Sequence, residues 1–129
     1  MIFGERPAAG TCLPSLTAGQ IVVADWRDGV TGEPNKMRPA VVVHDDELFD
    51  EQYPAVLLVP ITEGGPHVMK RLAVKLEPTA ENGCTKICYA ISHLVAATAT
   101  NRIRKTPSRI SAEQLREIRQ QIAECIALS

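Results

Sequence analysis

The sequence lacks several features that define specialised classes of protein. No apolar run approaches the roughly 18 residues that a membrane-spanning helix requires. Residues 1–7 show no basic start followed by an apolar stretch, so no signal peptide is expected. Aromatic residues make up only 4% of the chain, which argues against a broad platform for stacking bases. We therefore expect a cytoplasmic protein without membrane contact.

The chain also lacks an excess of positive charge and a cluster of metal ligands. It has 14 Lys and Arg against 15 Asp and Glu, for a net charge of -1. A protein that coats nucleic acid would be far more basic, so any such contact must come from a few placed cations. Of Cys12, Cys84, Cys88 and Cys125, only the middle two are close in sequence. We expect reduced thiols, no metal site and no other cofactor.

The residues that are present suit one globular domain. The chain has 129 residues, of which 45% are hydrophobic and 22% charged, as in an ordinary soluble protein with one core. Residues 1–18 contain several Gly and Pro and no periodicity, so we interpret them as an N-terminal extension. The compact domain is expected to span residues 19–129.

Short runs rich in β-branched residues predict an antiparallel sheet. The predicted strands lie at residues 21–26, 40–43, 55–59, 72–76 and 86–91, with a short sixth strand as an option at 94–98. Pro39 fits the first position of the second strand, and Pro60 is expected to end the third. The loop at 27–37 is longer than the usual hairpin connection, and compact domains keep such loops mainly for function.

The clearest helix follows Ser111. This residue is a good N-cap, and Gln114 completes a capping box. Leu115, Ile118, Ile122 and Cys125/Ile126 fall on one apolar stripe, whereas Arg119 belongs to the face expected to meet solvent. The predicted fold is therefore mainly β with a C-terminal helix, either a strongly twisted sheet or a partly open barrel capped by that helix.

Three groups of residues suggest chemistry, each with a plainer alternative. Glu33 and Arg38 are separated by a turn that can bring acid and guanidinium together, or they form a surface salt bridge of little value. Thr62 places a hydroxyl at the rim of the sheet, or it caps a turn. His93 suits proton transfer near neutral pH, or it is a half-buried structural histidine.

Cations and one aromatic residue complete the candidates. Arg102, Arg104, Lys105 and Arg109 lie within eight residues and suit a phosphate backbone, or they form a solvated edge that blocks strand pairing. Together with Lys36 and Arg38, these cations can form a groove for RNA, either within one chain or across a dimer interface. Trp26 ends the first strand beside the long loop, where it either stacks one base or packs against the rim of the sheet.

Taken in order, these pieces resemble the PemK/MazF family of toxin endoribonucleases. The matching segments are residues 19–22 (GQIV), 32–43 (GEPNKMRPAVVV), 59–62 (VPIT), 102–103 (RI) and 110–115 (ISAEQL). The resemblance implies a small SH3-like barrel of the CcdB/PemK type with a C-terminal helix, usually a homodimer. It also implies metal-independent cleavage of single-stranded RNA at short sequences. The partner is a cognate antitoxin, through which alone the toxin meets DNA.

By position, the resemblance assigns Arg38 to the family's catalytic arginine, Glu33 to an acid used by some members, and Thr62 to a hydroxyl that contacts phosphate. The chemistry of 2′-hydroxyl attack then makes Glu33 the candidate base and His93 the candidate acid, because an arginine holds its proton too tightly. Lys36, Trp26, Arg102, Arg104 and Lys105 are the candidate RNA-binding residues.

The chain departs from the family pattern in three places. It has Gly32 where many members have Ser or His and Pro34 where many have Gln. The late strand often carries an Asp with an Arg three residues on, and this chain has His93 and Ala96 there. These departures keep open a degenerate homologue that binds RNA or a protein partner without cutting. A gyrase poison like the CcdB toxins is a second alternative, although the chain ends without the Trp-Gly-Ile sequence associated with that group.

Overall fold

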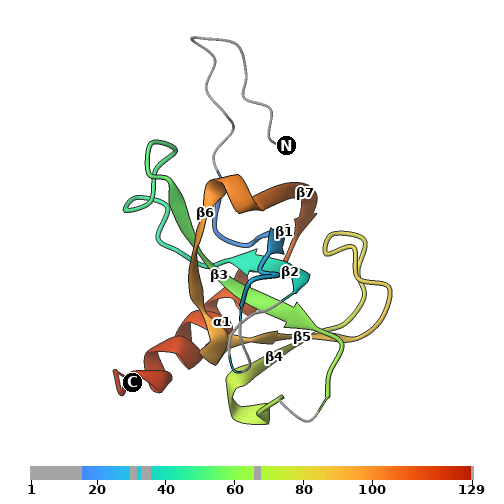
Figure 1. The fold of residues 1–129 in the computed structure, drawn as a ribbon. Coiled ribbons are helices and arrows are strands. Elements are labelled where there is room, and N and C mark those ends of the chain that lie inside the picture. Colours follow the sequence, from blue (N-terminus) through green and yellow to red (C-terminus); the bar gives the residue numbers. More distant parts are fainter. Residues whose placement is uncertain (1–15, 30–31, 33–35, 66–67, 129) are drawn as a thin grey trace.

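The computed structural model describes residues 16–29, 32, 36–65 and 68–128. Within them, β strands dominate and a single α-helix closes the chain (Figure 1). The strands are β1 (Gln20–Asp25), β2 (Met37–Val42), β3 (Ala55–Thr62), β4 (Ala73–Leu76), β5 (Cys88–Ile91), β6 (Ala96–Ala99) and β7 (Ile103–Arg109). The helices are α1 (Ala112–Cys125) and the short 3-10 turns η1 (Lys70–Leu72), η2 (Ser92–Leu94) and η3 (Thr100–Arg102). The predicted fold class, mainly β with a C-terminal helix, is confirmed.

All strand pairs are antiparallel, and β3 is the centre of the sheet. The order is β4-β5-β3-β2-β1-β7, and β6 also pairs with β3. The first half of β3 pairs with β6 and its last two residues pair with β5, so one long strand serves two partners on the same side. The path does not return to its start, so the sheet stays open rather than closing into a barrel.

The sheet is buried on both faces because side chains alternate along each strand. One face, here called the helix face, carries a core that includes Ile21, Val41 and Val59 and is covered by α1 through Ile118. The other face, here called the Trp26 face, carries Val22, Ala24, Ala40, Val42 and Leu58. Trp26 and Ile103 complete that second core.

The helix begins as the sequence predicts. The Ser111 side chain accepts a bond from the Gln114 amide, and the Gln114 side chain accepts from the Ser111 amide, which completes the capping box. Ile118 is fully buried, but the predicted apolar stripe is wrong at its end, where Cys125 and Ile126 are exposed. The helix has run past the edge of the sheet by then, so nothing remains for these residues to cover.

Arg119 is exposed, as predicted, and its side chain also makes two hydrogen bonds to the backbone. Its Nε and an Nη donate to the carbonyl oxygens of Val43 and His44, 3.0 and 2.6 Å away. These carbonyls follow β2, where the strand has ended and no partner strand takes them up. The arginine therefore ties α1 to the end of β2.

The two prolines were placed wrongly. Pro60 does not end β3, which continues to Thr62, and Pro39 is the third residue of β2 rather than its first. On one side, Pro60 pairs with Ala40 of β2. On the other side it has no partner among the described residues, because β6 pairs with β3 before Pro60 and β5 pairs with β3 after it. A residue without an N–H is tolerated there because no second ladder bond is required of it.

One strand was missed altogether. β7 holds the cation cluster, and its burial pattern is mostly exposed, so it lacks the apolar signal on which strand prediction depends. It pairs with β1 at one end of the sheet path. No helix within the described residues is both long and apolar enough to cross a membrane.

Candidate functional site

The fold places Arg38 and Thr62 on the same face of the sheet. Arg38 precedes Ala40 by two residues in β2, and Thr62 follows Pro60 by two in β3. Ala40 and Pro60 are cross-strand partners, and side chains two apart share a face, so all four lie on the Trp26 face. Ala40 and Pro60 are the last pair of the β2–β3 ladder, so Arg38 and Thr62 lie just beyond its end.

Both side chains lie where the buried face becomes accessible. Ala24, the partner of Arg38 on β1, is fully buried, whereas Arg38 and Thr62 are half-buried. Arg38 was expected to precede the strand, but it lies within β2, where it pairs with Ala24 on β1. Glu33 lies outside the described residues, so its pairing with Arg38 stays a prediction.

A hollow of about 480 Å³ opens beside Trp26. It is lined by Trp26, Asp28, Gly29, Gly32, His93, Leu94, Val95 and Ala96. The loop between β1 and β2 supplies one wall, and η2 with the start of β6 supplies the other. The structure thus places His93 next to the long loop that the sequence singled out as functional. Asp28 was not predicted, because nothing but the length of its loop marks it in the sequence.

His93 has one nitrogen that makes no bond. Its Nδ1 is buried and lacks a hydrogen-bond partner among the described residues. A buried ring nitrogen without a partner is uncommon and costs free energy unless a ligand or water meets it.

Trp26 is a core residue. Only 5% of it is exposed, and its indole N–H donates to Thr98 Oγ1 at 3.0 Å. Of the two roles that the sequence left open, packing against the sheet is what the structure shows. The ring still contributes to the wall of the hollow.

The predicted cations do not form a single groove. Arg102 is paired with Asp28, and Arg109 donates to the Thr17 hydroxyl and the Ala18 carbonyl, which anchors the chain before β1. Arg104 and Lys105 are successive in β7 opposite Val23 and Val22, so they project to opposite faces.

The start of the long loop is strongly ion-paired. Arg27 donates Nε and an Nη to the two carboxylate oxygens of Asp25, at 2.9 and 2.8 Å, and its backbone N–H is 3.2 Å from the same group. These hydrogen bonds lower the pKa of Asp25 to about 2. The carboxylate therefore stays charged and holds Arg27 in place beside the Asp28–Arg102 pair.

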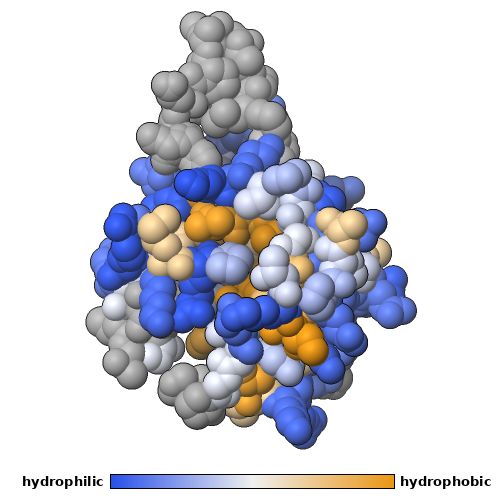
Figure 2. All heavy atoms as spheres, turned by 90° about the vertical axis from the view of Figure 1, so that its right-hand side faces the viewer, coloured by the Kyte–Doolittle hydropathy of each residue, from blue (hydrophilic) through white to orange (hydrophobic). Residues whose placement is uncertain are grey.

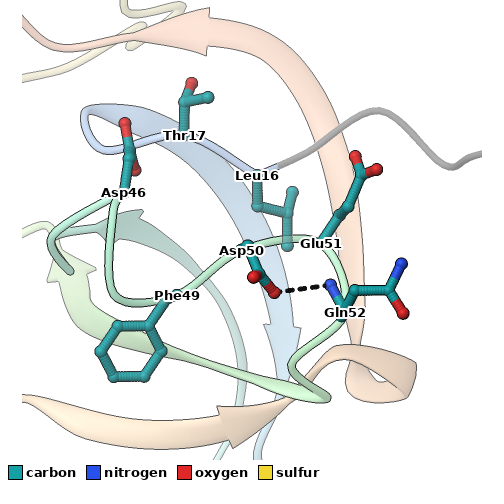
Figure 3. Close-up of a pocket in the computed structure, with 7 residues that line it drawn as sticks. All are labelled: Leu16, Thr17, Asp46, Phe49, Asp50, Glu51 and Gln52. Carbon is teal, nitrogen blue, oxygen red and sulfur yellow. Dashed lines mark hydrogen bonds between the residues drawn. The ribbon is translucent and has the colours of Figure 1, made fainter.

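A second hollow, of about 380 Å³, has the wrong charge for a phosphate (Figure 3). Its walls include Leu16, Phe49, Asp46, Asp50 and Glu51. Figure 3 shows the carboxylates around its rim, with Asp50 accepting the backbone N–H of Gln52 at 2.9 Å. Carboxylates repel phosphate, so the hollow beside Trp26 is the better candidate site for a nucleic acid.

The cysteines show no metal centre. Among the described residues, no group of three or more His, Cys, Asp and Glu side chains is placed to hold a metal ion. Cys84 and Cys88 lie against the core of the helix face. Burial, with the neighbouring Cys88 thiol, raises the pKa of Cys84 to about 11, so Cys84 stays a neutral thiol near pH 7.

Together these features define a small, mainly β protein in which an arginine and a hydroxyl share one face of the sheet and a histidine lines a hollow beside the long loop. The sequence model of the PemK-like, MazF-like toxins of type II toxin-antitoxin systems matches residues 17–126. The chain belongs to this family. A comparison with curated protein sequences finds no match.

Solved structures agree on the fold. MazF (Form-I) from Deinococcus radiodurans superposes with a TM-score of 0.71 at 16% identity, over 88% of this chain and 97% of that one. The toxin MazF-mt6 of Mycobacterium tuberculosis superposes with a TM-score of 0.67 at 16% sequence identity, over 85% of this chain and 98% of that one. An endoribonuclease in complex with its cognate antitoxin, from a mycobacterial species, superposes with a TM-score of 0.66 at 14% sequence identity, over 87% of this chain and 95% of that one.

Proposed function

We propose that this chain is a toxin that cleaves single-stranded RNA at specific sequences, without a metal ion, by attack of the ribose 2′-hydroxyl on the adjacent phosphorus. The observation that carries the proposal is the position of Arg38 on β2 and Thr62 on β3, each two residues beyond the paired Ala40 and Pro60, half-buried on the same face of the sheet. Membership of the toxin family and the likeness to a solved endoribonuclease support it.

The reaction needs charge neutralisation first. Negative charge grows on the non-bridging oxygens as the phosphorus becomes five-coordinate, and the forked donors of Arg38 match those oxygens. The Thr62 hydroxyl, one strand away, donates a further bond to the same phosphate. Both groups are carried by neighbouring strands, so their positions are set before the substrate arrives, and no reorganisation is needed during the reaction.

Two proton transfers complete the reaction. Glu33 is the proposed base that takes the proton of the 2′-hydroxyl. His93 is the proposed acid, giving a proton to the departing 5′-oxygen. Each transfer is worth roughly 100- to 10,000-fold in rate. The products are a 2′,3′-cyclic phosphate and a 5′-hydroxyl end, and the protein returns to its starting state after protons exchange with water.

The RNA is held by a few cations rather than by net charge. Lys36 and Arg38 lie where the long loop joins β2. Arg102, in η3, forms an ion pair with Asp28 near the start of that loop. Lys105 and Arg104 extend the basic area along β7. Trp26 lines the hollow and is proposed to contact one base there by its accessible edge.

We further propose an antitoxin and a second copy of the chain as protein partners, in the cytoplasm. Structures similar to this one include a toxin in complex with its cognate antitoxin. Figure 2 shows a face on which apolar residues gather at the centre and hydrophilic residues surround them. Such an arrangement is typical of surfaces that bind other proteins.

The deciding experiment compares purified Arg38→Ala with wild type on a long single-stranded RNA, with the cut ends mapped. Losing one preorganised donor of this kind typically slows the reaction on the order of 100- to 1000-fold. Arg116→Ala, on the exposed side of α1, is the matched control and should cut normally. Circular dichroism checks that both variants fold.

Two further arms test the chemistry. A substrate with 2′-deoxyribose at the mapped site should resist cleavage, and EDTA should leave the rate unchanged. Normal cleavage by Arg38→Ala would remove Arg38 from the mechanism. No cleavage by wild-type protein would favour the degenerate homologue that binds without cutting.

A further inference from the structure

Thr62 belongs to a row of side chains that continues across two further strands. Thr62 pairs with Tyr89 on β5, and Tyr89 pairs with Lys75 on β4. Cross-strand partners share a face, so Tyr89 and Lys75 lie on the Trp26 face with the proposed catalytic pair. The neighbours of Lys75 in β4, Val74 and Leu76, are buried in the core of the helix face, which confirms this alternation.

Exposure rises along this row. Thr62 and Tyr89 are half-buried, and Lys75 is exposed. The row therefore leads from the proposed reacting phosphate to open solvent. Neighbouring strands lie about 4.8 Å apart, so Lys75 lies roughly 10 Å from Thr62, two strand spacings away. A nucleotide next to the scissile phosphate can cover that distance.

The Tyr89 ring lies beside Gly64, in the turn that follows β3. Its Cε1 is 3.7 Å from the position that a Cβ would take at Gly64. The turn has no side chain at Gly64 to cover the ring, and φ there is +125°, a conformation that disfavours other residues. A half-buried tyrosine that is left uncovered at this point is suited to stacking against a base.

Lys75 supplies a charge that no acid neutralises. Within the described part of the chain it makes no ion pair, whereas nearby Lys86 pairs with Glu63 at 3.6 Å. Lys75 is also the one basic residue of the short strand β4. An unpaired ammonium on the face that carries Arg38 attracts a phosphate.

We infer that Tyr89 and Lys75 form a subsite for one nucleotide flanking the scissile phosphate, in which the Tyr89 ring stacks on the base and Lys75 binds the next phosphate. The inference rests on the proposed function, because it takes single-stranded RNA as the ligand. It assigns binding, not chemistry, to both residues.

The test uses an RNA oligonucleotide that carries the mapped cleavage site, in full length and shortened from either end. For Lys75→Gln, KM should rise about 4-fold at physiological salt, and the salt slope of binding should fall by about 0.7, as one lost phosphate contact predicts for single strands. For Tyr89→Leu, KM should rise roughly 5- to 150-fold, the range measured for loss of base stacking. For both variants kcat should change little, and Tyr89→Phe should behave as wild type.

Controls separate this subsite from general effects. Arg116→Gln removes one charge on the opposite side of the sheet and should change neither KM nor the salt slope. Shortening the substrate on the flank that reaches the subsite should remove the difference between wild type and Lys75→Gln. Equal KM for Lys75→Gln and Arg116→Gln, or a change of oligomeric state by light scattering in place of a change in KM, overturns the inference.

A binding arm keeps the inference independent of the nuclease proposal. The affinity of a fluorescein-labelled, 2′-deoxy-protected oligonucleotide is measured by anisotropy with the same variants. If wild type cuts no RNA, the proposed function fails, yet a selective loss of affinity in Lys75→Gln and Tyr89→Leu still supports the subsite. Affinities equal to that of Arg116→Gln overturn it.

Discussion

Cys84 shows how a single side chain is inactivated by its place in the fold. Its thiol lies half-buried against the core of the helix face, and burial with the Cys88 thiol raises its pKa to about 11. The thiolate is the reactive form, so near pH 8 very little of Cys84 is nucleophilic. Cys125 is exposed at the end of α1 and has no such covering.

We therefore predict that iodoacetamide at pH 8 alkylates Cys125 well before Cys84, as measured by peptide mass spectrometry over time. The rate at Cys84 should climb as the pH approaches 11, and in guanidinium chloride the two residues should react alike. The pKa of Cys84 is raised above its usual value of 9.0, so its contribution to stability is complete below pH 9 and is lost between 9 and 11. Equal rates in the folded protein would contradict this environment.

The sequence singled out candidate residues but could not predict which of them lie near one another. Arg38, Thr62 and His93 were chosen from residue type, order and the family resemblance, and their chemistry stays a prediction. The fold places Arg38 and Thr62 on one face of the sheet and His93 on the wall of a hollow. Tyr89 and Lys75 were missed, because only the register of β3, β5 and β4 aligns them with Thr62. Register depends on contacts between distant segments, which no local pattern contains.

At the scale of elements, the sequence predicted a structure correctly where the hydrogen bonds that stabilise it form within one short segment. The α1 cap was readable because Ser111 and Gln114 bond each other's backbone within one turn. β7 could not be predicted from its own sequence, which is polar and contains Pro107. It forms a strand because it pairs with β1, a distant segment of the chain. Polar residues and a proline are common in strands at the end of a sheet, where they discourage pairing with other molecules.

The capping box gives a prediction for the helix. Ser111→Ala removes the acceptor of the Gln114 amide and should lower the free energy of unfolding by about 0.5–2 kcal/mol. Ser111→Asp keeps an acceptor at the cap and should stay close to wild type. Urea denaturation followed by circular dichroism measures both. A loss as large in Ser111→Asp as in Ser111→Ala would show that the cap bond is not the cause.

At the scale of the whole molecule, the two faces of the sheet are joined beneath the candidate site. The Ser92 hydroxyl donates to Gln121 Oε1 at 2.6 Å, and Gln121 Nε2 donates to the Ala73 carbonyl at 3.2 Å. Ser92 is fully buried and belongs to η2, next to His93. The helix on one face therefore holds the turn that carries His93, a wall residue of the hollow beside Trp26.

Ser92→Ala tests that connection. The change leaves the buried Gln121 Oε1 without a donor, which costs about 1–3 kcal/mol of unfolding free energy. Because η2 then loses its bond to α1, kcat for RNA cleavage should fall while KM changes little, since the cations that bind RNA lie on other elements. Gln121→Met with Ser92→Ala removes both partners of the Ser92–Gln121 bond. It should recover only part of the stability, because the Ala73 carbonyl then lacks the Gln121 donor, and it should not recover kcat. Full activity in Ser92→Ala, at a temperature where it is entirely folded, would show that η2 holds His93 without the helix.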